Sequence, residues 1–375
     1  MNLRRAMLTA SFLVNLVFTG CGGGASWHSI PVQNVAATPT ITTTPAQNGA
    51  VVVTLTSSTS GATVYYSIDG STPTTSSRQY LAPFLVSSNL TLNAIATASG
   101  DTNSMVASKT FTPNIASGTL VWSDEFSNSS PNKAQPSPAT WTYDTGYQCC
   151  GNNELETYCA WGSTASPCNS ANPNAYVGTD GYLHVVAETP SSGVYTSGRL
   201  KSQGLFSFQY GRIEARMLLP ESQGMWPAFW LLGNNISTIN WPACGEADVM
   251  EHIDGSNPPP NAGGTPPGYD WTQASIHGTS LNGGKPYTTT GFSAAAWHTY
   301  GMIWTKGQIQ YYVDDPTNIY ETFTPSTQSG TWPFDQGPQF ILLNLAVGGD
   351  WPGSPNGSTV FPADMQVDYV RIYAN

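Results

Sequence analysis

Three carboxylates fall within six residues, at Glu246, Asp248 and Glu251, in a chain of which only 9% is charged. On a regular β-strand side chains alternate between two faces, so Glu246 and Asp248 point one way and Glu251 the other. One extra residue in the strand, a β-bulge, would return Glu251 to the side of the other two and leave Val249 and Met250 to pack behind. The pattern therefore predicts a bulged strand with three acids on one concave face.

Two carboxylates about 5 Å apart are what a retaining glycosidase needs, one as nucleophile and one as general acid and then base. A third acid between them adds like-charge repulsion, which helps to keep one carboxyl protonated near neutral pH. A solvated acidic strand or a calcium site is the alternative, because short acidic patterns recur by chance. The flanking sequence, from Trp241 to Cys244, is aromatic and apolar and favours the catalytic interpretation.

The segment Glu246–Glu251 resembles the catalytic signature of glycoside hydrolase family 16, in the bulged form typical of laminarinases, agarases and carrageenases. Met250, the extra residue, argues against the lichenase branch. Further matching segments cover nearly all of residues 118 to 375 and follow in the order found in laminarinases: Trp122–Phe126, Gly151–Leu155, Tyr195–Arg199, Tyr210–Arg216, Trp226–Trp230 and Val367–Tyr373.

The resemblance implies an all-β fold, a two-sheet jelly roll of the concanavalin type with an open cleft. It also implies that Glu246 is the nucleophile, Glu251 the acid/base and Asp248 the residue that tunes them, with no cofactor needed for catalysis. The chain departs from the family at Ala247, where a larger aliphatic residue is usual. We expect this side chain to point away from the cleft.

Sugar rings present apolar C–H faces that stack on indoles, so a glycan cleft should be lined with Trp more than with Lys or Arg. Of the 12 Trp residues, we expect Trp226, Trp230, Trp241 and Trp351 to line the cleft, with filling of the sandwich core as the alternative for each. The resemblance favours Trp230 and Trp241 as stacking platforms near the cleavage point.

Four polar residues match substrate-binding positions of the family. His277 matches a cleft histidine beside the leaving group, although a lone His is more often a structural residue. Asn153, Glu154 and Arg199 match positions that hydrogen-bond sugar hydroxyls, with a loop scaffold as the alternative. Glu125 and Asp368 match positions that often help to bind a structural calcium ion, and calcium prefers such oxygen ligands.

A net charge of −11 with only 12 Lys and Arg argues against nucleic acid or a polyanionic glycan as partner. A neutral β-glucan remains, so we predict a monomeric endo-acting hydrolase of β-1,3-glucan such as laminarin. Mixed-linkage β-1,3-1,4-glucanase, agarase and transglycosylase are alternatives within the family. A non-catalytic β-glucan-binding protein is the alternative from another class, but such relatives have lost the acids.

Residues 1–21 carry two positive charges near the start, at Arg4 and Arg5, followed by an apolar stretch and by small residues before Cys21. This pattern predicts a secretory signal. The small residues before Cys21 resemble a bacterial lipoprotein signal, in which that Cys is acylated. An ordinary cleaved signal is the alternative. In both cases the protein leaves the cytoplasm, and membrane attachment would be through lipid alone, because no other apolar run is long enough to span a bilayer.

Setting Cys21 aside leaves an odd number of cysteines, Cys149, Cys150, Cys159, Cys168 and Cys244. In an oxidising compartment at least one should stay unpaired. Cys159 with Cys168 would close a loop near the cleft and Cys149 or Cys150 could join a second bridge, but connectivity cannot be read from the sequence. Nearby carboxylates would raise the pKa of the Cys244 thiol, which argues against a cysteine protease, and no Cys/His spacing typical of a metal site is present. We therefore interpret Cys244 as a buried thiol.

Residues 38–113 are rich in Thr and Ser and contain short β-type runs, which predict a small antiparallel sandwich. The segment from Gly61 to Thr74 resembles the immunoglobulin-like module at the C-terminus of chitobiases and hexosaminidases. A spacer that holds the enzyme off the membrane is favoured over glycan binding. Residues 22–37 are expected to be a flexible linker, with the catalytic domain spanning 118–375.

Overall fold

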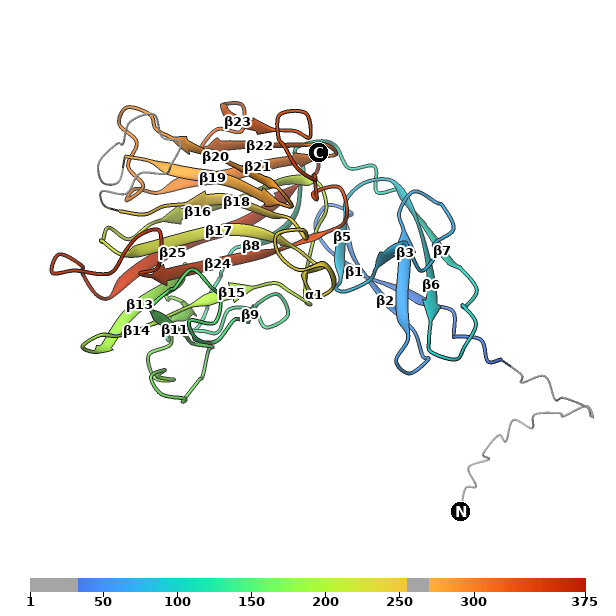
Figure 1. Ribbon diagram of the computed structural model, residues 1–375, viewed down its shortest axis with the longest axis horizontal. Coiled ribbons are helices and arrows are strands. Elements are labelled where there is room, and N and C mark those ends of the chain that lie inside the picture. Colours follow the sequence, from blue (N-terminus) through green and yellow to red (C-terminus); the bar gives the residue numbers. More distant parts are fainter. Residues whose placement is uncertain (1–32, 255–269) are drawn as a thin grey trace, which may run out of the picture.

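The computed structural model describes residues 33–254 and 270–375 (Figure 1). Strands dominate these residues, and their single helix, α1 (Ile236–Ile239), has only four residues. This confirms the predicted all-β class. No helix of the described part is long and apolar enough to cross a membrane. Cys21 and the signal segment lie outside the described residues.

Two small sheets build the N-terminal module, seen at the right of Figure 1. One has the order β1-β2-β5 and the other β4-β3-β6-β7. Alternation explains the packing, since Val64 and Tyr66 of β3 are buried while their neighbours are half-buried. The strands are β1 (Thr40–Pro45), β2 (Val51–Thr56), β3 (Thr63–Ser67), β4 (Arg78–Gln79), β5 (Phe84–Val86), β6 (Leu90–Thr97) and β7 (Ala107–Phe111).

The remaining strands form two large sheets that pack face to face, which confirms the predicted jelly-roll sandwich. The eleven-stranded sheet follows the path β10-β11-β14-β13-β25-β16-β21-β22-β23, with β12 paired to β13 and β8 to β25. Its strands are β8 (Leu120–Asp124), β10 (Gly146–Tyr147), β11 (Glu156–Tyr158), β12 (Ala175–Val177), β13 (Leu183–Ser191), β14 (Val194–Ser197), β16 (Gly211–Leu218), β21 (His298–Thr305), β22 (Gln308–Val313), β23 (Ile319–Phe323) and β25 (Ala363–Tyr373).

The seven-stranded sheet has the order β20-β19-β18-β17-β24-β15-β9 and carries the three acids on β18, an interior strand next to the central β17. Its strands are β9 (Thr142–Tyr143), β15 (Arg199–Lys201), β17 (Met225–Gly233), β18 (Glu246–Glu251), β19 (Thr272–Gly278), β20 (Leu281–Tyr287) and β24 (Gln339–Val347).

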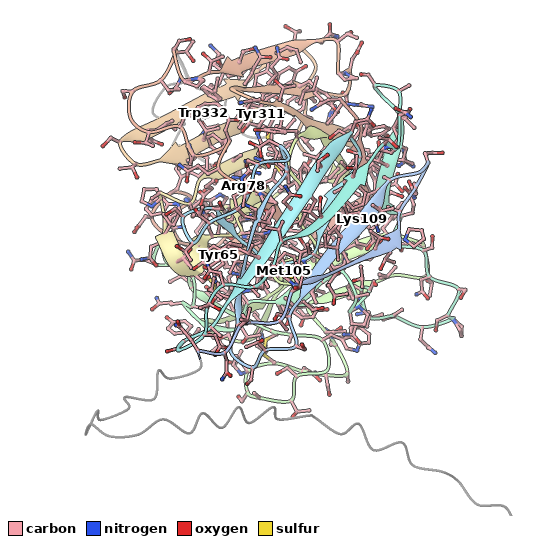
Figure 2. All side chains as sticks on the ribbon, turned by 90° about the vertical axis from the view of Figure 1, so that its right-hand side faces the viewer. Tyr65, Arg78, Met105, Lys109, Tyr311 and Trp332 are labelled. Atoms are coloured by element: carbon pink, nitrogen blue, oxygen red, sulfur yellow. A yellow bond between two sulfur atoms is a disulfide. The ribbon has the colours of Figure 1, made fainter. Side chains whose placement is uncertain are left out.

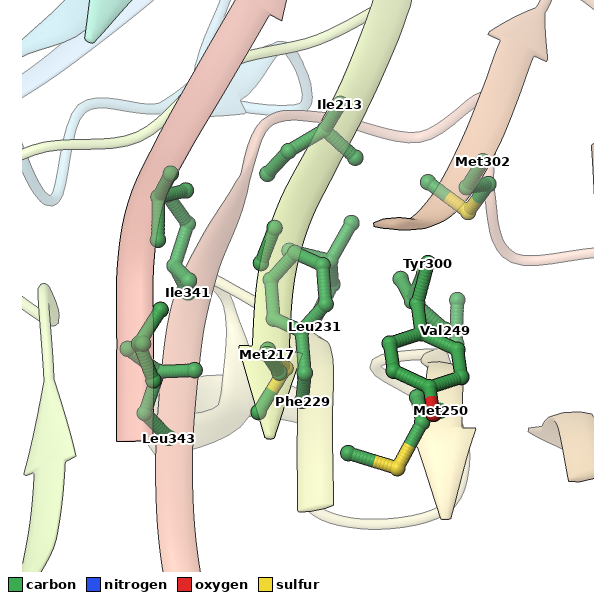
Figure 3. Packing of buried hydrophobic residues seen from close by; sticks show 14 of the residues in the cluster. Ile213, Met217, Phe229, Leu231, Val249, Met250, Tyr300, Met302, Ile341 and Leu343 are labelled. Atoms are coloured by element: carbon green, nitrogen blue, oxygen red, sulfur yellow. The ribbon is translucent and has the colours of Figure 1, made fainter. Parts of the chain in front are cut away.

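The main core lies between the two large sheets. Phe229 and Leu231 of β17 and Ile341 and Leu343 of β24 point into it (Figure 3). The residues between them belong to a second apolar cluster on the opposite face, which includes Trp230. The period of two therefore gives each strand a core face and a cleft face.

A β-bulge interrupts β18, as the sequence predicts. Against β17, Phe229 pairs with Met250 and Trp230 with Asp248, so the extra residue in the ladder is Val249, whereas the family resemblance implied Met250. The register with β19 shifts over the same stretch, between Asp248 and Glu251. Val249 and Met250 are both buried in the core (Figure 3). Ala247 is also fully buried there, so it points away from the cleft as expected.

The N-terminal module packs directly against the large sandwich. The amide of Leu85 donates to the carbonyl of Ser207 at 2.9 Å. The Arg78 guanidinium donates to the Gln209 side chain at 2.8 Å and to the Asp335 carbonyl at 2.9 Å. Figure 2 looks onto this module and labels Arg78. Leu85 also belongs to the main core cluster, so the module and the sandwich share apolar contacts.

The module begins earlier than the sequence predicts. Val35 pairs with Thr102, and Ala36 is buried in the module core and donates its amide to the Thr102 carbonyl. Residues 33–37 thus belong to the module, and only 22–32 of the expected linker lie outside the described residues. The pairing of an extended segment with the 98–104 turn carried no signal in the sequence.

Two disulfides occur among the described cysteines, one between Cys159 and Cys168 and one between the neighbours Cys149 and Cys150. Cys244 is the free, buried cysteine among them, which confirms that at least one stays unpaired. The direct Cys149–Cys150 bridge was not anticipated, since we expected only one of these two residues to take part in a second bridge.

Met250→Ala is expected to lower the free energy of unfolding by about 2 to 5 kcal/mol, because truncating a fully buried side chain leaves a cavity. Met105→Ala is the matched control, since Met105 is 76% exposed on the module (Figure 2), and it should change stability by less than about 0.5 kcal/mol. Denaturant unfolding followed by tryptophan fluorescence measures both. Equal effects would contradict the inward position of Met250.

Candidate active site

The cleft face of the seven-stranded sheet holds two adjoining cavities. The larger, about 630 Å³, includes His277, Gln273 and Ser275 of β19, and we call it the His277 half. The smaller, about 340 Å³, includes Arg199 of β15 and Trp230, and we call it the Arg199 half. Both are in the size range of ligand sites. The residues that line both halves are Asn152, Trp226, Trp241, Glu246 and Glu251.

The bulge brings all three acids to this cleft. Glu246 and Glu251 line both halves, and Asp248 lines the Arg199 half between them. Opposite them on β19, Glu246 pairs with His277 and Asp248 with Ser275. The two glutamates therefore stand where the two halves meet, at the centre of the groove.

Each glutamate is held by an indole. The Trp241 Nε1–H donates to Glu246 Oε2 at 3.0 Å, and the Trp226 Nε1–H donates to Glu251 Oε1 at 3.1 Å. The Ser275 hydroxyl donates to the other oxygen of Glu251 at 3.3 Å. The two indoles and the hydroxyl are neutral donors. They therefore orient the two carboxyls without adding a positive charge, which would favour the ionised form of both.

His277 lies beside the acids. Its Nε2 is 3.2 Å from Asp248 Oδ2 and 3.9 Å from Glu246 Oε1. Among the described residues, Glu246, Asp248 and His277 are also the one group of three whose donor atoms lie close enough to hold a metal ion, within 4.8 Å of one another. Because Glu246 and Asp248 also adjoin Glu251 in the cleft, we treat this group as part of the catalytic cluster.

Burial raises the pKa of all three carboxyls, to about 8 for each of Glu246, Asp248 and Glu251. Desolvation is the largest cause, and the charge of Asp248 raises the pKa of both glutamates further. His277 acts in the opposite direction on both glutamates, and Arg199 does so on Glu246. Three such groups cannot all be charged at neutral pH, so the cluster holds at least one proton.

The chain resembles known proteins over most of its length. A model of glycosyl hydrolases family 16 matches residues 162–371. A model of the chitobiase/beta-hexosaminidase C-terminal domain matches residues 43–110. A beta-glucanase of Rhodothermus marinus is 36% identical over 271 residues, which are 68% of this chain and 84% of that protein. The chain belongs to glycosyl hydrolase family 16.

Two further similarities agree with this assignment. A glucan endo-1,3-beta-glucosidase A1 of Niallia circulans is 34% identical over 281 residues, 70% of this chain and 38% of that protein. The laminarinase catalytic domain of Thermotoga maritima superposes with a TM-score of 0.56 at 31% identity, covering 68% of this chain and 98% of that domain. The protein is therefore a family 16 glycoside hydrolase with an additional N-terminal module.

The four predicted tryptophans all line the cleft of this hydrolase. Trp226 and Trp351 meet edge to face in the His277 half, with ring centroids 5.4 Å apart. Trp230 forms part of the Arg199 half, and the Arg199 guanidinium lies 4.8 Å above its ring. Trp241 is 58% exposed at the rim, which leaves its face accessible to a sugar ring.

A hydrogen-bond network supports the Arg199 half. Trp230 Nε1–H donates to Asn344 at 2.8 Å, Asn344 donates to the Tyr158 hydroxyl at 3.3 Å, and Tyr158 donates to Glu154 at 2.9 Å. Arg199 donates through Nε to Asp144 at 3.1 Å. The network fixes the floor of the cavity before any ligand binds.

Sequence reasoning missed several of these residues. Asn344 had a signal, because it is the single internal polar residue in an otherwise apolar buried strand, Gln339–Val347. Glu156 had none, because its complete burial on a short strand is visible only in the structure. Burial raises its pKa to about 8, and it accepts the Val347 amide at 2.8 Å. Ser275 and Tyr158 had none, since nothing local distinguishes them from other strand residues.

Asn153 differs from its predicted position. Its amide donates to the Asp350 carboxylate at 2.9 Å, and it lines neither half of the cleft. The neighbouring Asn152 lines both halves. Both residues have a positive φ, 58° and 54°, so the chain turns sharply here and the adjacent side chains take different directions.

Glu125 and Asp368 are each paired with an arginine. Arg371 holds Glu125 through two hydrogen bonds of 2.9 and 2.8 Å, which lowers the pKa of that carboxyl. Arg216 holds Asp368 at 2.7 Å. Both carboxylates already have a cationic partner, so these side chains give no support to the calcium expectation.

Cys244 should resist alkylation in the folded enzyme, because the thiol is buried and burial, with the charge of Glu246 adding to it, raises its pKa to about 11. In a Cys21→Ser variant kept oxidised, iodoacetamide at pH 7.5 should add nothing to the native protein and one group after unfolding in urea. Intact mass measures the number of adducts. Rapid labelling of the native form would contradict the buried thiol, and more than one adduct after unfolding would contradict the two disulfides.

Proposed function

We propose that this family 16 enzyme is an endo-acting, retaining hydrolase of β-1,3-glucan. The observation that carries the proposal is the pair of glutamates, Glu246 and Glu251, each anchored by a cleft tryptophan where the two halves of an open groove meet. The groove admits a polymer that continues on both sides of the cleavage point. Its indole lining fits the apolar faces of uncharged sugar rings.

In the first step Glu246 attacks the anomeric carbon of the ring in the Arg199 half, while Glu251 gives its proton to the leaving oxygen. The bond to the leaving sugar breaks, and a covalent glycosyl-enzyme forms on Glu246. Glu251, now ionised, then takes a proton from a water molecule as that water attacks the same carbon. The bond between the sugar and Glu246 breaks, and both glutamates return to their starting state. Two inversions at one carbon retain the configuration.

The cluster is suited to these roles. The side chain of Glu246 is more accessible than that of Asp248, 18% exposed against 4%, and it has Trp241, His277 and Arg199 to stabilise its charge. Glu251 is half-buried beside Asp248, and its hydrogen-bond donors, Trp226 and Ser275, are neutral. We assign the proton of the resting enzyme to Glu251, because the Arg199 guanidinium favours ionisation of Glu246 while the charge of Asp248 helps to keep Glu251 protonated.

The relatives support β-1,3-glucan as the substrate, since those named above include a glucan endo-1,3-beta-glucosidase and a laminarinase. A mixed-linkage glucanase, an agarase and a transglycosylase would use the same acids. A non-catalytic glucan-binding protein is disfavoured because the acids and their tryptophan donors are all in place. We further propose that the enzyme is monomeric, that it leaves the cytoplasm and that Cys21 is its only membrane anchor, through lipid.

Glu246→Gln and Glu251→Gln should each reduce the release of reducing sugar from laminarin by at least about 1,000-fold, because each removes one step of the displacement. Barley glucan, agarose and xyloglucan in the same assay test the linkage. Proton NMR of the early product of the unaltered enzyme should show the β-anomer first. Early α-anomer, or near-normal rates in either variant, would overturn the mechanism.

Asp248→Asn should move the alkaline limb of the kcat/KM profile to lower pH. Glu251 must be protonated to act, so activity falls as pH rises through its pKa, which burial and Asp248 raise to about 8. Removing the Asp248 charge removes the second cause of that rise and lowers the pKa. Rates on a soluble laminari-oligosaccharide from pH 4 to 10 measure the shift. A limb that stays in place would show that Asp248 does not tune Glu251.

A further inference from the structure

The Cys149–Cys150 disulfide lies on the wall of the cleft. It sits in the loop between β10 and β11, and Cys150 lines the Arg199 half together with Trp230 and Glu246. Cys149 is exposed and Cys150 is half-buried, so the bridge runs from the solvent-exposed surface to the residue that borders the cavity. No role in the proposed chemistry uses either sulfur.

Stability does not explain this bridge. A disulfide stabilises a fold mainly by shortening the unfolded chain, and the effect grows with the logarithm of the loop that it closes. Cys149 and Cys150 are adjacent, so their bridge encloses no intervening residue, whereas Cys159 and Cys168 are nine positions apart. The restraint gained by the first bridge is therefore close to the smallest that a disulfide can give.

The loop holds the disulfide at a fixed place. Gln148, Gly151 and Asn152 have φ values of 48°, 101° and 58°, so the chain folds back tightly on both sides of the bridge. The Asn152 carbonyl accepts the Asp350 amide at 2.9 Å, and Asn153 donates to the Asp350 carboxylate. These bonds tie the loop to the segment that carries Trp351.

The surroundings of Cys150 match one face of a sugar ring. Trp230, Trp241 and Ile236 line the same cavity and offer apolar surface, while Arg199 and Asn152 offer polar groups. A disulfide is a compact, polarisable and apolar group with little hydrogen-bonding demand, so C–H groups can pack on it as they do on an indole. The cavity thus presents apolar walls for ring faces and polar groups for hydroxyls.

We propose that the Cys149–Cys150 disulfide is a substrate-contact surface, against which a glucosyl ring of the glucan packs in the Arg199 half, beyond the ring at the cleavage point. The inference rests on the proposed glucanase function. The bridge then acts in binding and leaves the chemical step untouched. Its contribution depends on a substrate long enough to reach it.

Titration calorimetry on the full chain carrying Glu246→Gln tests this with β-1,3-linked oligosaccharides of two to seven glucose units. C149S/C150S replaces the sulfur surface by hydroxyls and should weaken binding of the longest oligosaccharides about 5-fold to 10-fold, the effect expected for losing some 40–60 Å² of apolar contact. The shortest oligosaccharides should bind as before. C149A/C150L restores an apolar surface without the bridge and should recover most of the loss.

Two comparisons make the result decisive. C159S/C168S removes the disulfide that lines neither half of the cleft, so it should lower the melting temperature without a dependence on oligosaccharide length. Unchanged affinities in C149S/C150S, or a loss that is equal at every length, would overturn the contact role. If the Glu246→Gln chain binds no β-1,3-glucan oligosaccharide at all and the unaltered enzyme cleaves none, the proposed function itself fails.

Discussion

Removal of three carboxylates from water is the interaction on which the rest of the site depends. Glu246, Asp248 and Glu251 stand on one strand, and burial raises the pKa of each to about 8. An isolated buried charge would be very unfavourable, and the usual response is to retain a proton. A general acid at neutral pH requires this condition, so the desolvation that opposes folding at this point also prepares the chemistry.

The strand β18 can carry this cluster because one of its faces packs in the core and the other lines the cleft. Ala247, Val249 and Met250 fill the core between the sheets, while the acids occupy the cleft side. Because the bulge adds one residue, Val249 and Met250 can both point into the core while Glu251 still points into the cleft. Neutral donors from Trp226 and Trp241 then orient the glutamates without neutralising them. Positioning and acidity are thus set by different groups.

Much of the arrangement of β18 and of the N-terminal module could be predicted from the sequence, because it depends on short-range periodicity. The inward Ala247 and the short strands of the N-terminal module follow from alternation over a few residues, and the bulge follows from Glu251, which regular alternation would place on the wrong face. What depends on distant contacts was not readable. The turn of Asn153 toward Asp350 joins residues 197 positions apart, and the arginine partner of Glu125 lies 246 positions away. The direct bond between Cys149 and Cys150 depends on a local loop conformation that composition does not encode.

The N-terminal module is docked on the large sandwich, which argues against the interpretation that it is only a spacer. Arg78 reaches the carbonyl of Asp335, whose carboxylate accepts the Tyr210 hydroxyl and the Gly307 amide. In the same loop Pro333 abuts Gly245, whose φ of 84° and close neighbours leave no room for a side chain. Gly245 directly precedes Glu246, the proposed nucleophile. A module tied to this loop through Arg78, and sharing the main core through Leu85, is a fixed part of the enzyme rather than a freely swinging spacer.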